Sequence, residues 1–204
     1  MRMKKSFVFI LVAGFVALLS AAIPPVFAAS SSCGGSGCTT GAVDLNFQIN
    51  IPAMVRLRIG AAASADTITF DPSAAVLGTG ASVTGTGGNL TAGEVTVQVI
   101  ANGAASVDVD TSVTGGGSGL ACQAGGSCVP GTDFIGWDEI TTTGNGCTVA
   151  PPVLDNTGSG SANYSAGGGV IQELCSWTYT YDNSLTYLDG SYTGTVTYTA
   201  THNP

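Results

Sequence analysis

Residues 43–59 read VDLNFQINIPAMVRLRI, and apolar and polar side chains alternate along this stretch. Successive side chains of a β-strand point to opposite faces, so the pattern predicts a strand with one apolar face and one polar face. These seventeen residues would span roughly 56 Å if fully extended, whereas a globular chain of this size is only about 40 Å across. The strand therefore either breaks at Pro52 and changes sheet, or leaves its own domain to pair with a neighbouring molecule.

These alternatives assign different roles to residues 43–51. In the first, the residues on either side of Pro52 form the split first strand of an immunoglobulin-like sandwich. In the second, residues 43–51 insert into a groove of the next subunit, where main-chain hydrogen bonds provide affinity and apolar side chains fill successive pockets. The candidate residues for this strand donation are Val43, Leu45, Phe47, Ile49 and Ile51.

The first 28 residues have the pattern of a signal peptide. Arg2, Lys4 and Lys5 precede an apolar run at residues 7–19, and Val-Phe-Ala at 26–28 forms a small-residue cleavage site. The apolar run is shorter than the roughly twenty residues of a membrane-spanning helix. We therefore expect a secreted protein at the cell surface, in the extracellular space or in the periplasm. A flexible Gly/Ser/Cys arm at 29–41 would precede a single domain at 42–204.

Removal of the signal peptide leaves a strongly acidic chain. Arg56 and Arg58 are then the only basic residues, against thirteen acidic ones, which gives a net charge of -11. Such a charge repels phosphate backbones and excludes nucleic acid as a partner.

The composition predicts an all-β fold, because Gly, Thr, Ser and Val are abundant while Lys, Glu and Gln are rare. We expect a two-sheet antiparallel immunoglobulin-like sandwich of about seven or eight strands with Gly-rich loops. Asn102 and Gly103 predict a hairpin turn, and residues 115–131 and 141–169 are expected to be mostly loops. Besides the first strand, we expect strands at 67–70, 82–84, 94–101, 105–109, 134–140, 171–181 and 190–201.

Six cysteines follow the signal peptide, and an even number in an exported chain predicts disulfide bonds. Their spacing favours bonds between neighbours in the sequence, namely Cys33–Cys38, Cys122–Cys128 and Cys147–Cys175. Metal binding is the alternative, but there is no Cys-x-x-Cys pair and the single histidine, His202, lies near the C-terminus. We expect no metal and no cofactor.

The sequence offers little for catalysis, and we expect no enzyme. It lacks a Gly-x-Ser-x-Gly motif, and the even cysteine count leaves no free thiol. Glu94, Glu139 and Glu173 are the only glutamates, and each is also typical of a solvated strand or loop.

Two ligand sites remain as hypotheses. Asp108 and Asp110 project from one face of a strand, and Asp133, Asp138 and Glu139 lie close together in sequence, so calcium is one candidate. Trp137, Trp177 and the tyrosines are candidates for a glycan-stacking platform, although aromatic residues at strand spacing are more often core.

Residues 189–198 read DGSYTGTVTY and resemble the final strand of the spore-coat-U type of pilin domain. An exported, disulfide-bearing, Thr/Gly-rich sandwich that opens on an alternating strand also resembles bacterial fimbrial subunits. The resemblance implies subunits that are exported, chaperoned and polymerised by strand donation. The chain departs from this family in having no cysteine in its first strand and in ending on Thr-His-Asn-Pro rather than on an aromatic residue.

The sequence therefore favours an exported structural or surface protein, and specifically a fibre subunit that associates with itself or other fibre subunits by strand donation. The alternative is a monomeric cell-surface binding module for glycan or calcium.

Overall fold

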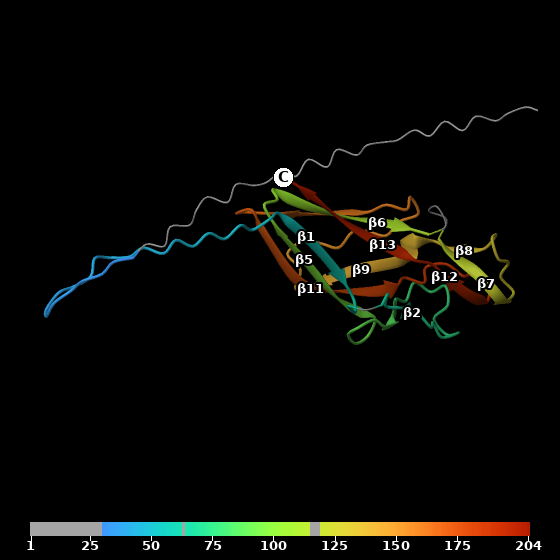
Figure 1. The fold of residues 1–204 in the computed structure, drawn as a ribbon. Coiled ribbons are helices and arrows are strands. Elements are labelled where there is room, and N and C mark those ends of the chain that lie inside the picture. Colours follow the sequence, from blue (N-terminus) through green and yellow to red (C-terminus); the bar gives the residue numbers. More distant parts are fainter. Residues whose placement is uncertain (1–29, 63, 115–118) are drawn as a thin grey trace, which may run out of the picture. The chain divides into compact units, whose positions relative to one another are not determined.

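The computed structural model describes residues 30–62, 64–114 and 119–204 (Figure 1). The signal peptide predicted at 1–28 lies outside the described residues. The elements are β1 (Met54–Ile59), β2 (Ile68–Thr69), β3 (Val83–Thr84), β4 (Thr86–Gly87), β5 (Glu94–Asn102), β6 (Ser106–Val113), β7 (Leu120–Gly126), β8 (Phe134–Ile135), the 3-10 turn η1 (Trp137–Glu139), β9 (Ile140–Asn145), β10 (Ser161–Ser165), β11 (Val170–Tyr181), β12 (Gly190–Thr193) and β13 (Val196–Asn203). The predicted all-β fold is confirmed.

Two antiparallel sheets form the sandwich. The first sheet has the order β1-β5-β11-β3, and β9 also pairs with β11. The second sheet has the order β10-β6-β13. Two smaller sheets, β12-β7-β8 and β2-β4, complete the fold. Among the described strands, β1 and β13 each pair with a partner on one side only, so each is an edge strand of its sheet.

The core lies between the first and second sheets. Alternate residues of β5 and β6, among them Val97, Val99 and Val107, are fully buried. The ring of Trp177 on β11 packs against Tyr198 on β13, with 5.3 Å between ring centroids. The period-2 burial along these strands agrees with the alternation in their sequences.

The turn at Asn102 and Gly103 does not form the hairpin predicted for it. Gly103 has the positive φ (68°) that this turn sequence favours. However, β5 pairs with β1 and β11, whereas β6 pairs with β10 and β13. The chain therefore crosses from one sheet to the other here. Turn chemistry fixes the local backbone, but burial of both strands from opposite sides decides which sheet each one joins.

Several segments expected as loops or single strands have a different structure. Strand β7 lies within the predicted loop 115–131, while β9 and β10 lie within or overlap the predicted loop 141–169. The predicted strand at 134–140 is instead β8 followed by η1, and the final strand is divided into β12 and β13. Short polar strands such as β9 form because they pair with a long central strand, β11, which their own sequence does not reveal.

Only the second half of the predicted seventeen-residue strand forms a strand in the structure. Only Met54–Ile59 forms a strand, and no strand is assigned to residues 38–53. The chain divides into two units between Asn50 and Ile51, whereas the prediction placed the start of the domain at residue 42. Within the described residues, the segment before Pro52 therefore does not form part of either sheet of its own domain.

All six cysteines are paired, and the pairing is the one favoured by their spacing. The Cα–Cα distances are 6.0 Å for Cys33–Cys38, 6.1 Å for Cys122–Cys128 and 5.0 Å for Cys147–Cys175. Disulfides persist in oxidising compartments, so the three bonds fit an extracellular or periplasmic location. Among the described residues, no helix has the length and hydrophobicity needed to span a membrane.

Candidate functional site

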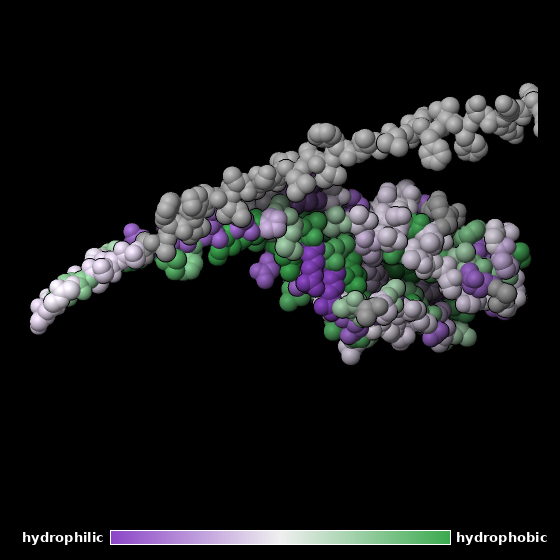
Figure 2. Space-filling view, in the orientation of Figure 1, coloured by the Kyte–Doolittle hydropathy of each residue, from purple (hydrophilic) through white to green (hydrophobic). Residues whose placement is uncertain are grey.

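An apolar groove of about 530 Å³ lies beside the edge strand β1. The surface is hollowed next to this strand in the space-filling view (Figure 2). The residues that line the groove come from β1, β2, β5, β7, η1, β9, β11, β13 and the segments between strands. Its principal apolar residues are Leu57, Ile59, Ile68, Phe70, Trp137, Leu154, Val196 and Tyr198.

The groove is bordered by β1 and β13, two edge strands that do not pair with each other in the described part of the chain. The side chains of Leu57 and Ile59 point inward from β1 and are only partly buried. Val196 and Tyr198 do the same from β13. Edge strands leave alternate N–H and C=O groups without a partner, so β1 offers main-chain hydrogen bonds beside an apolar channel.

Two tyrosines lie in the wall of this groove, which is also lined by the polar residues Asp66, Thr67 and Thr195. The hydroxyl oxygens of Tyr179 and Tyr198 lie 3.0 Å apart. Burial raises the pKa of Tyr198 to about 12, and burial, reinforced by Tyr198, raises the pKa of Tyr179 further above its usual value. Each hydroxyl thus has a hydrogen-bond partner within the wall of the groove.

The tyrosine pair makes stability sensitive to alkaline pH. Because both folded-state pKa values exceed the unfolded value of about 10, the folded protein holds more protons, and stability falls as the pH rises from about 10 towards 12. The loss should be on the order of 1 kcal/mol per tyrosine at pH 11. Denaturant unfolding of Tyr179→Phe with Tyr198→Phe should show a smaller loss between pH 8 and 11. Tyr192→Phe is the comparison, because the pKa of this tyrosine outside the groove is raised less, and it should reduce the alkaline loss less than the groove pair does. A reduction as large as that of the groove pair would contradict this assignment.

The predicted strand-donation residues are exposed along residues 43–51, which are called the arm from here on. The exposed fraction is 52% for Val43 and between 75% and 85% for the other four side chains, Leu45, Phe47, Ile49 and Ile51. Exposed apolar side chains at alternate positions are unusual for a soluble chain unless they have a partner. The arrangement thus consists of an unpaired apolar strand sequence and, in the compact unit, an open apolar groove.

Comparisons with known proteins supply no further assignment. Searches of protein-family models, curated proteins and solved structures find no significant match. The site must be interpreted from its own geometry.

Of the acids considered for calcium, Asp108, Asp133 and Asp138 accept hydrogen bonds within the protein, whereas the Asp110 carboxylate has no hydrogen bond among the described residues. The two carboxylate oxygens of Asp108 accept hydrogen bonds from Asn163 (2.5 Å) and Asn203 (2.8 Å), which hold the pKa of Asp108 below its usual value. Asp138 accepts a hydrogen bond from Asn156 (2.7 Å), and Asp133 accepts one from the Val129 N–H (2.6 Å). Their oxygens stabilise loops and strand pairs.

The tryptophans considered for glycan stacking are buried. Trp137 is 3% exposed and Trp177 is 0% exposed, so neither ring presents a face to a sugar. Trp137 instead forms part of the groove wall. A carbon added at Gly194 would meet the Trp137 ring at 2.6 Å, so this glycine allows the chain before β13 to lie against the indole.

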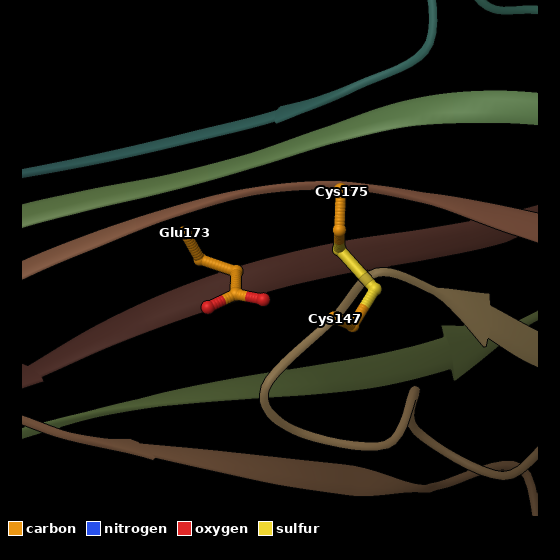
Figure 3. A group of neighbouring side chains, drawn as sticks. All are labelled: Cys147, Glu173 and Cys175. Carbon is orange, nitrogen blue, oxygen red and sulfur yellow. A yellow bond between two sulfur atoms is a disulfide. The ribbon is translucent and has the colours of Figure 1, made fainter.

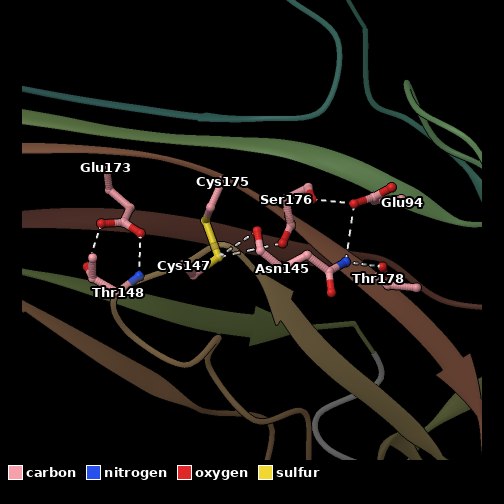
Figure 4. Close-up of a disulfide and its surroundings, with 8 residues drawn as sticks. All are labelled: Glu94, Asn145, Cys147, Thr148, Glu173, Cys175, Ser176 and Thr178. Atoms are coloured by element: carbon pink, nitrogen blue, oxygen red, sulfur yellow. Dashed lines mark hydrogen bonds between the residues drawn. A yellow bond between two sulfur atoms is a disulfide. The ribbon is translucent and has the colours of Figure 1, made fainter.

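Cys147, Glu173 and Cys175 form the one cluster of three metal-ligand side-chain types within the described part of the chain (Figure 3). The two sulfur atoms are bonded to each other and are not available as thiolate ligands. Glu173 was expected to be solvated but is only 6% exposed. One carboxylate oxygen accepts the Thr148 N–H (2.6 Å) and the other accepts the Thr148 hydroxyl (2.5 Å), as Figure 4 shows. The cluster therefore anchors the loop after β9 to β11.

Glu139 was also expected to be solvated, and it is buried for a similar reason. Its carboxylate accepts hydrogen bonds from the Ser184 N–H (2.9 Å) and the Ser184 hydroxyl. Both glutamates replace lost hydration with protein donors. The alternation in the sequence did not predict that the two glutamates are buried, because their hydrogen-bond donors lie in loops distant in the sequence.

Replacing Glu173 should measurably destabilise the protein. Glu173→Gln keeps the shape but loses the charge and turns one acceptor into a donor facing Thr148. Hydrogen bonds to a buried charge contribute about 1.5–3 kcal/mol, so we expect a loss of about 2 kcal/mol in the free energy of unfolding. Gln172→Glu, on the opposite face of β11, is the control and should change stability by less than about 0.5 kcal/mol. Equal effects of the two substitutions in denaturant unfolding would show that the buried hydrogen bonds are unimportant.

Proposed function

We propose that this protein is a subunit of an extracellular fibre, in which residues 43–51 of one copy insert into the groove beside β1 of the next copy. The single observation that carries this proposal is the coexistence of an exposed, alternating apolar segment and an open apolar groove between two sheet edges. Strand addition to an exposed sheet edge is a general mode of recognition that combines main-chain hydrogen bonds with side-chain pockets.

The alternation of the arm matches what the groove requires. A strand added to β1 has every second side chain facing the core and the others facing solvent. The five apolar side chains of residues 43–51 share one parity, and the four polar ones share the other. Such a strand would cover Leu57 and Ile59 with apolar side chains and leave Asn and Gln in water.

Geometry disfavours direct pairing of residues 43–51 with β1 of the same molecule. To pair directly with β1, the chain would have to turn back at Pro52 and Ala53. In a two-residue hairpin, Ile51 and Met54 would oppose each other and share a face. The apolar side chains would then lie on the outer face of β1, away from the groove. A three-residue loop would correct the face but needs a residue with positive φ, typically glycine, and the available residues are Pro, Ala and Met.

The resemblance of residues 189–198 to the last strand of spore-coat-U type pilins supports the same proposal. These residues contain β12 and the start of β13, and β13 borders the groove. Export through a signal peptide and a cell-surface or periplasmic location also belong to the proposal, and the three disulfides support them.

The test is the size of the protein that begins at residue 29, measured by size-exclusion chromatography with light scattering over a range of concentrations. We expect oligomers that persist in detergent gels as a ladder and collapse to one band after boiling. A monomer at every concentration, before and after refolding at high concentration, would overturn the proposal.

A further inference from the structure

The outer face of β1 carries the only positive charges described in the chain. Arg56 and Arg58 project from this face, since the side chain of Leu57 between them points to the core. In the space-filling view, a strongly hydrophilic strip over β1 is flanked by hydrophobic surface (Figure 2). Among the described residues, the only hydrogen bond of either guanidinium runs from Arg58 Nε to the Gly60 carbonyl oxygen (3.2 Å), and neither is paired with a carboxylate.

These arginines lie where an added strand would be placed. A shallow depression of about 300 Å³ follows the edge of β1 and is lined by Arg56, Leu57, Arg58, Ile59, Ala61 and Ala62. Any strand that pairs here would bring its outward-facing side chains about 5 Å from those of the arginines, measured between Cβ atoms.

The arm contains a single charged residue, Asp44, and it lies on the polar face of the arm. When the apolar side chains of residues 43–51 face the groove, Asp44 faces outward together with the arginines. The remaining outward residues, Asn46, Gln48 and Asn50, are neutral. The charge on the arm is therefore complementary to the charge on β1, and it is confined to one end of the arm.

We propose that Asp44 of one copy pairs with Arg56 and Arg58 of the next copy and so fixes the register and direction of the donated strand. This inference rests on the strand donation proposed above. The groove begins at Leu57 and continues past Ile59. With Asp44 beside the arginines, a strand parallel to β1 carries Phe47, Ile49 and Ile51 into that continuation, whereas the opposite direction carries them away from it.

The ion pair selects a register because backbone pairing alone does not. Alternating apolar residues of similar size fit a groove in several registers that differ by two residues. A carboxylate opposite a guanidinium is favourable, and two like charges directly opposite are unfavourable. In a protein with thirteen acids and two remaining bases, a misplaced Asp44 would face neutral or acidic surface instead.

The test measures binding of synthetic peptides that span residues 42–51 to the full chain from residue 29. The arm of the receiving chain is inactivated by Phe47→Asp and Ile49→Asp, so that the protein offers an empty groove. Binding is followed by tryptophan fluorescence, because Trp137 lines the groove, and by calorimetry. Asp44→Asn in the peptide should weaken binding about threefold, and Asp44→Arg about tenfold, on the scale of exposed cross-strand ion pairs.

Two comparisons isolate the ion pair. A receiving chain with Arg56→Glu and Arg58→Glu should prefer the Asp44→Arg peptide over the wild-type peptide. This is the reverse of the preference expected of the receiving chain that keeps both arginines. A peptide with Asp44→Asn and Asn50→Asp has the same composition and net charge as wild type, yet should bind as weakly as Asp44→Asn. Thermal unfolding confirms that the receiving variants are folded.

The outcomes separate the two proposals. If all peptides bind the two receiving chains equally well, strand donation stands and the role of Asp44 is overturned. Equal binding of the wild-type and composition-matched peptides would likewise overturn it, because only overall charge would matter. If no peptide binds, including wild type, both proposals fail.

Discussion

Phe47→Asp combined with Ile49→Asp should abolish oligomer formation while leaving the domain folded. Both side chains are more than four-fifths exposed in the arm, so the substitutions remove no packing from the domain. In the donated strand they would lie in an apolar groove, where each buried, unpaired carboxylate costs several kcal/mol. The association constant should fall by at least about a thousandfold. Light scattering and detergent gels without boiling measure the loss.

The matched control places the same charges on the other face of the arm. Asn46→Asp with Gln48→Asp also adds two carboxylates, but these would face solvent in the donated strand. We expect this control to assemble within about tenfold of wild type, since exposed charges contribute little. If both double variants assemble equally, the apolar parity of the arm has no role, and donation through this face is wrong.

Thermal unfolding of the same variants distinguishes donation from the alternative in which the arm belongs to its own sandwich. If residues 43–51 were packed in their own domain, burying two carboxylates there would lower its melting temperature strongly. We expect the isolated monomer of Phe47→Asp with Ile49→Asp to melt at the temperature of the wild-type monomer. A large decrease in the melting temperature would show that residues 43–51 pack in the core of their own domain.

Strands that are long and buried on one face could be predicted from sequence, and strands held by distant partners could not. Val95, Val97 and Val99 alternate with polar residues, and β5 forms where this pattern predicts. β10 contains only Ala162 and Tyr164 as buried side chains, and it forms because β6 lies beside it. The turn at Gly103 shows a related limit, because its local geometry was predictable while the change of sheet was not.

The two halves of the candidate site differ in the same way. The proposed donor arm is continuous in sequence, so its alternation alone is sufficient to mark residues 43–51 as a candidate. The groove combines Leu57, Phe70, Trp137 and Val196 from segments far apart in the chain. No local pattern links them, although aromatic residues at strand spacing, such as Trp137, are more often core.

Removing the Cys147–Cys175 disulfide should cause the largest loss of stability in the domain. The bond closes 28 residues, against 6 for Cys122–Cys128, and it joins the loop after β9 to the central strand β11. A loop of that length contributes about 3–4 kcal/mol in the chain-entropy model, whereas the shorter loop contributes about 2 kcal/mol. The longer bond also holds Thr148 against Glu173, so its loss weakens the buried hydrogen bonds of that pair.

The measurement is denaturant unfolding of three double variants, each with both cysteines of one bond changed to alanine. Cys147→Ala with Cys175→Ala should lower the free energy of unfolding by about 1–2 kcal/mol more than Cys122→Ala with Cys128→Ala. Both variants lose the same atoms, so the difference reflects loop length and the contacts each bond supports. Cys33→Ala with Cys38→Ala is the control, because this bond lies before Ile51, outside the compact unit, and should leave unfolding of that unit unchanged. If the three variants lose the same stability, the disulfides do not act on the domain through the loops they close, and the rigidity of β11 as one wall of the sandwich must come from its strand pairing alone.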